Sequence, residues 1–160
     1  MVKSETSKAR ERLLGFCIGN GLDIGHGGDK IVPNAIGIDM PTMYTNVGND
    51  VSQLRGDGTN LYWFKDGVLD FVYSSHLLED FIETEAVLIE WCRVLKTMGR
   101  LILLLPDQQM YKNYSANEHH KYPDFGPDFV KKRMPANMAL VYESGIIYDY
   151  NFALVYVKLE

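Results

Sequence analysis

The chain has 160 residues, 46% of them hydrophobic, which is enough to bury the core of one globular domain. Its formal net charge of -5 argues against a nucleic-acid backbone as the main partner, because proteins that bind nucleic acids present a basic face. The longest apolar run, Leu101 to Pro106, is far too short to span a bilayer, and no apolar signal core follows Met1, so we expect no membrane attachment.

The cysteine and histidine patterns give no sign of a metal centre. Cys17 and Cys92 lie far apart in apolar surroundings, which is typical of buried free thiols in a reducing compartment, so we expect a cytoplasmic protein. His119 and His120 are adjacent in a predicted loop and have neither a nearby cysteine nor a helix-spaced partner. We therefore expect no metal site and interpret His120 as a substrate or lid contact.

The N-terminal part is predicted to contain one helix and two short buried strands. Ser4 to Leu14 has the pattern of a polar helix closed by Gly15. Strands are predicted at about Gly21 to Gly25 and at Ala35 to Asp39. Parallel strands usually need a dozen or more connecting residues, and fewer are available here. The first crossover helix is therefore expected to be short or missing.

The middle of the chain alternates strand and helix patterns. A rudimentary strand is predicted around Val51 to Leu54, and Leu69 to Ser74 is an apolar run typical of the buried middle of a parallel sheet. Apolar residues recur at helical spacing from Glu83 to Met98, and Gly99 is placed as the helix stop. Arg100 to Leu105 follows as the next buried strand. Trp63 and Trp91 are interpreted as core aromatic residues.

The last part begins with a long loop from Gln108 to Pro127 that is rich in Tyr, Asn and His, and loops of this length are often lids or binding loops. Asp128 to Pro135 is predicted to be a short basic helix. Met138 to Glu143 and Phe152 to Leu159 are strand-like and close enough to form an antiparallel hairpin. Together these patterns predict an α/β fold with a mostly parallel sheet and a C-terminal hairpin.

The chain is organised around the segment Gly19 to Gly28. It places a carboxylate, Asp23, in a buried strand that breaks into Gly25, Gly27 and Gly28. Glycine allows positive φ and close approach of the backbone to a ligand. At the carboxyl end of a central parallel strand, such a turn lies where open α/β sheets bind nucleotide-like ligands, although glycine pairs also serve tight turning alone.

Five blocks follow one another in an order that resembles class I S-adenosylmethionine-dependent methyltransferases, in the small methyltransferase-domain subgroup called type 11. The blocks are Leu22 to Gly27, Ile36 to Asp39, Gly56 to Leu61, Asp66 to Asp80, and Glu90 to Leu101. The resemblance implies a Rossmann-like, doubly wound sheet, S-adenosylmethionine as the cofactor, and methyl transfer to a small-molecule or saccharide acceptor. Residues 1–160 are then one domain: an N-terminal helix and lead-in (1–18), a cofactor-binding half (19–107), and a lid loop, short helix and hairpin (108–160).

The resemblance assigns roles in cofactor binding to particular residues. Asp39, followed by Met40, resembles the acid that accepts hydrogen bonds from both ribose hydroxyls. Asp57 resembles the residue that accepts from the adenine amino group, and the Gly58 amide is available for a ring nitrogen.

The remaining cofactor candidates lie on the two central strands. The backbone amides of Gly25 and Gly27 are expected to approach the methionine and ribose portion closely. Asp23 either contacts the cofactor or only supports the turn, and both interpretations stay open. Ser74 is expected where the central strand opens beneath the reacting methyl group.

Methyl transfer is an in-line displacement, so alignment of the acceptor should supply much of the rate. A base is needed only when the acceptor must lose a proton. His76 and His120 are the candidates for this role because an unperturbed imidazole titrates near neutral pH.

Departures from the family pattern leave alternatives open. The interval from Asp23 to Asp39 is shorter than usual, and Asp80 stands where the family usually has histidine. These features motivate a catalytically degenerate binding or scaffold protein as the alternative. A nicotinamide-dependent oxidoreductase would share the glycine turn, but Lys30 stands where its third glycine is needed. A missing crossover helix would also expose apolar sheet surface, to be covered by the Ser4 to Leu14 helix or by a second copy, and we expect a homodimer.

Overall fold

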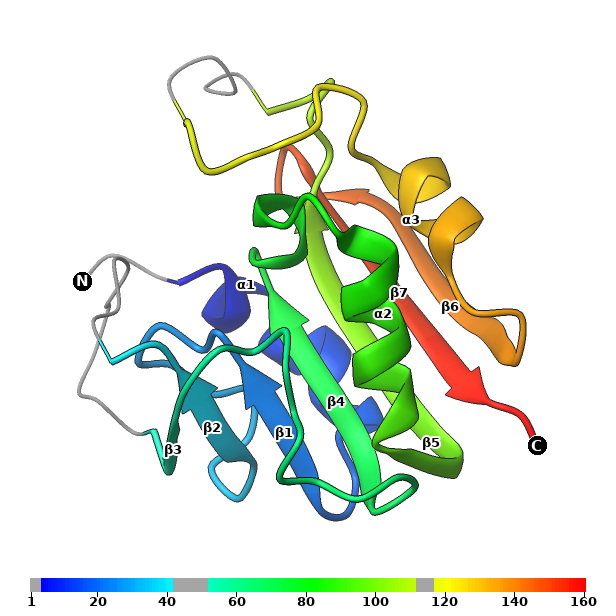
Figure 1. The fold of residues 1–160 in the computed structure, drawn as a ribbon. Coiled ribbons are helices and arrows are strands. Elements are labelled where there is room, and N and C mark those ends of the chain that lie inside the picture. Colours follow the sequence, from blue (N-terminus) through cyan, green and yellow to red (C-terminus); the bar gives the residue numbers. More distant parts are fainter. Residues whose placement is uncertain (1–3, 42–51, 112–116) are drawn as a thin grey trace.

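The computed structural model describes residues 4–41, 52–111 and 117–160, which form a seven-stranded sheet with helices on both faces (Figure 1). The strands are β1 (Gly21–Ile24), β2 (Ile36–Asp39), β3 (Leu54–Arg55), β4 (Leu69–Ser75), β5 (Leu95–Pro106), β6 (Met138–Ile147) and β7 (Asn151–Lys158). Their order is β3-β2-β1-β4-β5-β7-β6, and β7 runs antiparallel to both neighbours whereas the other pairs are parallel. The predicted Rossmann-like, doubly wound sheet with a C-terminal hairpin is confirmed.

The helices divide between the two faces of the sheet. In Figure 1, α2 (Thr84–Arg93) lies in front of the sheet and α1 (Glu5–Leu13) behind it. The front core contains Trp91, which is fully buried, together with residues of α3 (Pro127–Arg133). No helix in the described part of the chain is long and apolar enough to cross a bilayer.

The connection between β1 and β2 contains no helix, as its length predicted. The rear face is instead covered by α1 and by Ile31 from this connection. Ala9 and Leu13 of α1 are fully buried, as are Phe71 and Tyr73 on the sheet beneath them. The fold-back of the N-terminal helix therefore covers the face, and the reason for expecting a second copy falls away. The homodimer remains a prediction without that support.

The helix predicted over Glu83 to Met98 is too long. The helix α2 ends at Arg93, and the chain enters β5 at Leu95, so Gly99 lies within a strand instead of stopping a helix. Met98 adopts a positive φ of 67°, and the register with β4 shifts at this point. The apolar spacing continued past the helix end because Val94 and Leu95 are both fully buried in the core.

Other boundaries differ less. The strand predicted to end at Glu143 continues to Ile147, and the hairpin turns through Tyr148 and Asp149, which both have positive φ. Trp63 is 38% exposed, so its assignment to the core was wrong. Val51 of the predicted third strand and residues 112–116 of the predicted lid loop lie outside the described residues.

Candidate functional site

The parallel strands β1, β2 and β4 end side by side at one edge of the sheet (Figure 1). Most of the predicted cofactor residues lie in or directly after these strands, and Asp57 and Gly58 follow β3. The chain leaves β1 through Gly25, whose φ is +70°. A Cβ at this position would lie 2.7 Å from the Leu77 side chain, so both conformation and space require glycine. The turn therefore leaves no room for a side chain at position 25.

The amides of this turn are already engaged within the protein. Gly25 N–H donates to the carbonyl of Ile38 at 2.9 Å, and Gly27 N–H donates to Asp39 Oδ2 at 2.9 Å. Gly28 N–H donates to Nδ1 of His26 at 2.9 Å. The amides of Gly25 and Gly27 thus have acceptors within the protein, and the glycine turn fixes the acid at the end of β2. Their approach to the cofactor remains a prediction.

His26 is a member of this turn that the sequence reasoning missed. It is only 5% exposed, and its Nε2 lies 2.8 Å from Ser52 Oγ. Burial lowers the pKa of His26, so the ring is neutral at physiological pH. Its Nδ1 accepts from Gly28, which leaves Nε2 as the nitrogen that carries the proton.

Asp39 ends β2 with both carboxylate oxygens oriented by backbone amides. Oδ2 accepts from Gly27, and Oδ1 accepts from Met40 N–H at 2.8 Å. Met40 is 52% exposed, so the acid lies at the open rim of the sheet. A carboxylate offers about four lone-pair sites, and these two bonds leave room for two further donors.

The loop after β3 brings Asp57 and Gly58 to the same edge. Asp57 is exposed and accepts from Thr59 N–H at 2.8 Å, which shapes a tight turn. A Cβ on Gly58 would lie 2.4 Å from the Ile24 side chain, so the loop backbone packs directly on β1. The Gly58 carbonyl accepts from the Trp91 indole N–H at 2.7 Å, which ties this loop to α2.

Asp23 lies beneath the glycine turn and is 1% exposed. Its Oδ2 accepts from Ile31 N–H at 2.6 Å and so holds the helix-free connection against the sheet. Among the described residues, Oδ1 has no hydrogen-bond partner. Burial raises the pKa of Asp23 to about 8, so the carboxyl is largely protonated at neutral pH. These contacts favour the supporting role over direct cofactor contact.

Replacing Asp23 with asparagine is expected to flatten the pH dependence of stability. The folded-state pKa lies above the ordinary value near 4, so stability is lost as pH rises from about 4 to about 8. Asparagine keeps the acceptor for Ile31 and cannot ionise. Chemical unfolding at pH 5 and pH 8 should therefore show the variant gaining on the order of 1 kcal/mol or more relative to wild type across this interval. Exposed Asp124→Asn is the control, and equal pH dependence of Asp23→Asn and wild type would contradict the assignment.

Ser74 is also an internal support. It is fully buried, and its hydroxyl donates to the carbonyl of Ile24 at 3.0 Å, which joins β4 to β1 below the edge. The next turn begins at His76, a non-glycine residue with a φ of +51°. Positive φ at such a residue is uncommon and marks the place where β4 ends and the chain bends over the site.

The structure brings His76 and His120 together on one carboxylate, that of Glu79 in the short helix η2 (Leu78–Asp80). Glu79 Oε1 lies 3.8 Å from His76 Nδ1 and 3.7 Å from His120 Nε2. Glu79 is 1% exposed, and burial raises its pKa well above the usual value. Sequence reasoning missed this residue, although an acid inside an apolar stretch just after a buried strand was the available signal.

Both imidazoles are neutral at physiological pH. Burial lowers the pKa of His76 to about 4, and burial also lowers the pKa of His120. His76 Nε2 contacts Asn151 Oδ1 at 2.8 Å, and His120 Nδ1 contacts the Gln108 amide at 2.7 Å. The rings of Tyr111 and Tyr150 lie beside this pair of histidines. The low pKa makes His76 a weak base, so of the two candidates His120 fits that role better.

Solved structures with the same fold are similar to this chain over nearly its whole length. The PH0226 protein of Pyrococcus horikoshii OT3 has a TM-score of 0.72 at 19% identity, covering 98% of this chain and 92% of that one. A SAM-dependent methyltransferase of Archaeoglobus fulgidus has a TM-score of 0.72 at 15% identity (97% and 95% covered). A further SAM-dependent methyltransferase, from Aquifex aeolicus, has a TM-score of 0.61 at 14% identity (98% and 100% covered).

No curated protein matches the chain in sequence. The family model described as "Methyltransferase domain" matches residues 17–103, which contain β1 to β4, α2 and most of β5. This is more than half of the chain, and it includes the glycine turn, Asp39, Asp57 and the segment around Glu79. The chain therefore belongs to the methyltransferase-domain family, whose members use S-adenosylmethionine as the methyl donor.

Proposed function

We propose that the edge formed by β1, β2 and β4 binds S-adenosylmethionine and that the chain transfers its methyl group to a small-molecule or saccharide acceptor. The observation that carries this proposal is Asp39, fixed at the end of β2 by the amides of Gly27 and Met40. A carboxylate with two remaining acceptor positions suits the two adjacent hydroxyls of a ribose. Asp57 and the Gly58 amide would then face the adenine.

Two of the predicted cofactor residues act indirectly in this arrangement. Asp23 shapes the glycine turn through Ile31, and Ser74 joins the two central strands. Gly25 lets the turn pack against Leu77, at the place where the methionine portion would lie. Contact with the cofactor therefore falls to the backbone of the turn and to the acids of the neighbouring strands.

The acceptor would lie above the carboxyl ends of β4 and β5. Tyr111, His120 and Tyr150 form a set of rings there, with centroids about 5 Å apart between Tyr111 and each of the others. Such rings suit a sugar or an aromatic molecule. The net charge of -5 supports a small acceptor over a nucleic acid. The free, buried thiols of Cys17 and Cys92 support the expected cytoplasmic setting.

Isothermal titration with S-adenosylmethionine and with its demethylated product tests the binding step, and we expect saturable heat at one site per chain. Transfer is tested by incubating the protein with radiolabelled donor and fractionated small-molecule extracts. Label in a protein-dependent product supports the enzyme, whereas binding without any transfer favours the degenerate binding protein. No heat with either form of the cofactor would contradict the proposal.

A further inference from the structure

Glu79, Asp80 and His120 form a compact group of metal-ligand atoms. Each residue offers one atom, and all of these atoms lie within 4.8 Å of one another. Glu79 is 1% exposed, and among the described residues its Oε2 has no hydrogen-bond partner. A buried carboxylate oxygen without a partner is costly, because it has lost water and gained nothing in exchange. The group therefore needs a cation or a proton that these side chains do not supply.

The spacing within the group fits ligands of one ion better than it fits hydrogen bonds. Glu79 Oε1 and His120 Nε2 are 3.7 Å apart, which is longer than a hydrogen bond. Metal–ligand bonds of about 2.1 Å place two ligands roughly 3 to 4.2 Å apart, depending on the angle between them. Small side-chain rotations would bring the outermost pair of atoms into this range.

The contacts behind His120 prepare its Nε2 as a ligand. Its Nδ1 lies 2.7 Å from the side-chain amide of Gln108, whose Oε1 has no partner among the described residues. Exchanging the two ends of that amide gives Gln108 Oε1 a bond from Nδ1–H and leaves the lone pair of His120 on Nε2. An imidazole that donates from its far nitrogen to a fixed oxygen is the usual support of a metal-binding histidine.

His76 is oriented in a similar way, with its far nitrogen bonded to a side-chain amide and its near nitrogen towards Glu79. Glu5 Oε2 accepts from Asn151 Nδ2 at 2.7 Å, so Asn151 Oδ1 is the atom that faces His76. His76 Nε2 therefore donates to Asn151, and the lone pair of its Nδ1 lies towards Glu79, at 3.8 Å from Oε1. The close group of ligand atoms thus comes from η2 and the loop after β5, and His76, at the end of β4, places a further acceptor atom beside Glu79.

We propose that Glu79, Asp80 and His120 bind one divalent transition-metal ion, with His76 Nδ1 beside it as an additional ligand position. Two carboxylates neutralise the charge of a divalent ion. An imidazole among the ligands favours Mn²⁺, Fe²⁺ or Zn²⁺ over Mg²⁺ or Ca²⁺, which prefer oxygen alone. The adjacent His119–His120 pair gave no such indication in the sequence, because its partners come from a distant segment.

The catalytic use of this ion rests on the proposed function. An open coordination position would hold an acceptor hydroxyl and ease the loss of its proton to water. The acceptor oxygen would then bond to the methyl carbon while the methyl–sulfur bond breaks and its electron pair stays on sulfur. His120 would be a metal ligand in this arrangement, and no separate base would be needed.

Metal binding is tested on the full chain after removal of metals with a chelator. Titration with Mn²⁺, followed by the electron paramagnetic resonance of the free ion, is expected to show one bound equivalent, and Zn²⁺ should displace it. Glu79→Gln and His120→Ala should each weaken Mn²⁺ binding by more than about tenfold. His119, the exposed neighbour of His120, supplies the matched control, and His119→Ala should bind Mn²⁺ as wild type does.

Wild-type protein that binds no stoichiometric Mn²⁺ or Zn²⁺, or variants that bind as tightly as wild type, would overturn the site. Circular dichroism checks that Glu79→Gln is folded, and Asp80→Asn provides a second test if it is not. Titration with S-adenosylmethionine is run on the same samples. A metal-free protein that still binds the cofactor separates failure of the metal site from failure of the proposed function.

Discussion

Replacing Asp39 with alanine is expected to weaken S-adenosylmethionine binding by roughly a hundredfold. Two hydrogen bonds from ribose hydroxyls to a charged acceptor contribute together about 3 kcal/mol, and this sum corresponds to that factor. The affinity of Asp39→Asn should lie between those of wild type and Asp39→Ala, since one side-chain oxygen remains to accept a hydrogen bond. The dissociation constants are measured by isothermal titration of each folded variant.

The control for Asp39 is a remote acid of the same type. Asp128 in α3 has a side chain that is 87% exposed, and Asp128→Ala should leave the affinity for the cofactor unchanged. The amides of Gly27 and Met40 lose their acceptor in Asp39→Ala, so thermal unfolding is measured in parallel. An alanine variant that is folded and binds the cofactor as tightly as wild type would show that the ribose lies elsewhere.

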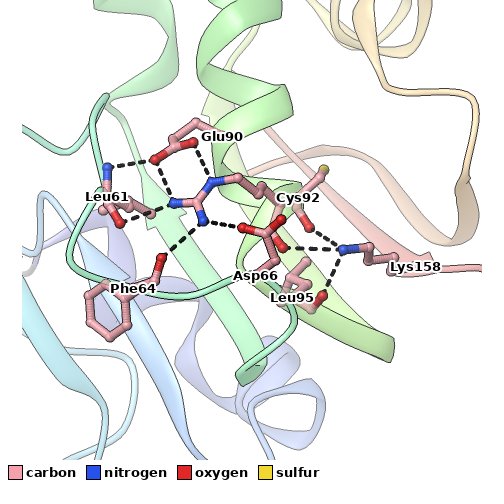
Figure 2. A network of polar contacts seen from close by, with 8 residues as sticks. Leu61, Phe64, Asp66, Glu90, Cys92, Leu95 and Lys158 are labelled. Atoms are coloured by element: carbon pink, nitrogen blue, oxygen red, sulfur yellow. Dashed lines mark hydrogen bonds and ion pairs between the residues drawn. The ribbon is translucent and has the colours of Figure 1, made fainter.

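Local sequence patterns were sufficient to predict most of the fold. Ser4 caps α1 by accepting from Ser7 N–H, and a polar residue before a helical pattern is a signal that the sequence carries by itself. The interval between β1 and β2 is also visible in the sequence, and it is too short for a full crossover helix. The end of α2 was not readable, because Val94 and Leu95 face the core in either conformation. The carbonyls at this junction are bound instead by Lys158 Nζ, from the far end of the chain (Figure 2).

The candidate site, too, was predicted where its residues are close in sequence and missed where only the fold brings them together. Asp39 and the glycine turn are close in sequence and were predicted together. The hydrogen bonds of the turn amides were not predicted, because they depend on how β1 and β2 pair. Glu79 and His120 are far apart in sequence, and only the packing of η2 under the loop after β5 joins them, through Lys121 N–H and the Glu79 carbonyl at 3.0 Å. A single sequence carries no signal for such a pairing.

Replacing Arg93 with methionine is expected to destabilise the fold by about 2 to 3 kcal/mol. Its guanidinium donates to both oxygens of Glu90 and to Asp66 Oδ1, at 2.6 to 2.9 Å. It also donates to the carbonyls of Phe64 and Leu61, at 2.9 and 3.1 Å (Figure 2). Methionine fills similar space without donors, so several acceptors lose their partner at once. Urea unfolding with linear extrapolation measures the change in the free energy of unfolding.

Arg93→Met should also disturb the cofactor site, because Arg93 holds the loop that continues from Gly58. Glu90 Oε1 also accepts from Leu61 N–H at 2.7 Å, so the start of this loop is fixed twice to α2. Arg93→Lys should recover little, since an ammonium group cannot make the forked pair with Glu90. Lys96→Met, which removes one exposed pair with Asp70, is the matched control and should leave stability unchanged. If Arg93→Met unfolds at the same urea concentration as that control, the bonds of Arg93 do not stabilise the loop, and its connection to α2 rests on the bonds of Trp91 to Gly58 and of Glu90 to Leu61.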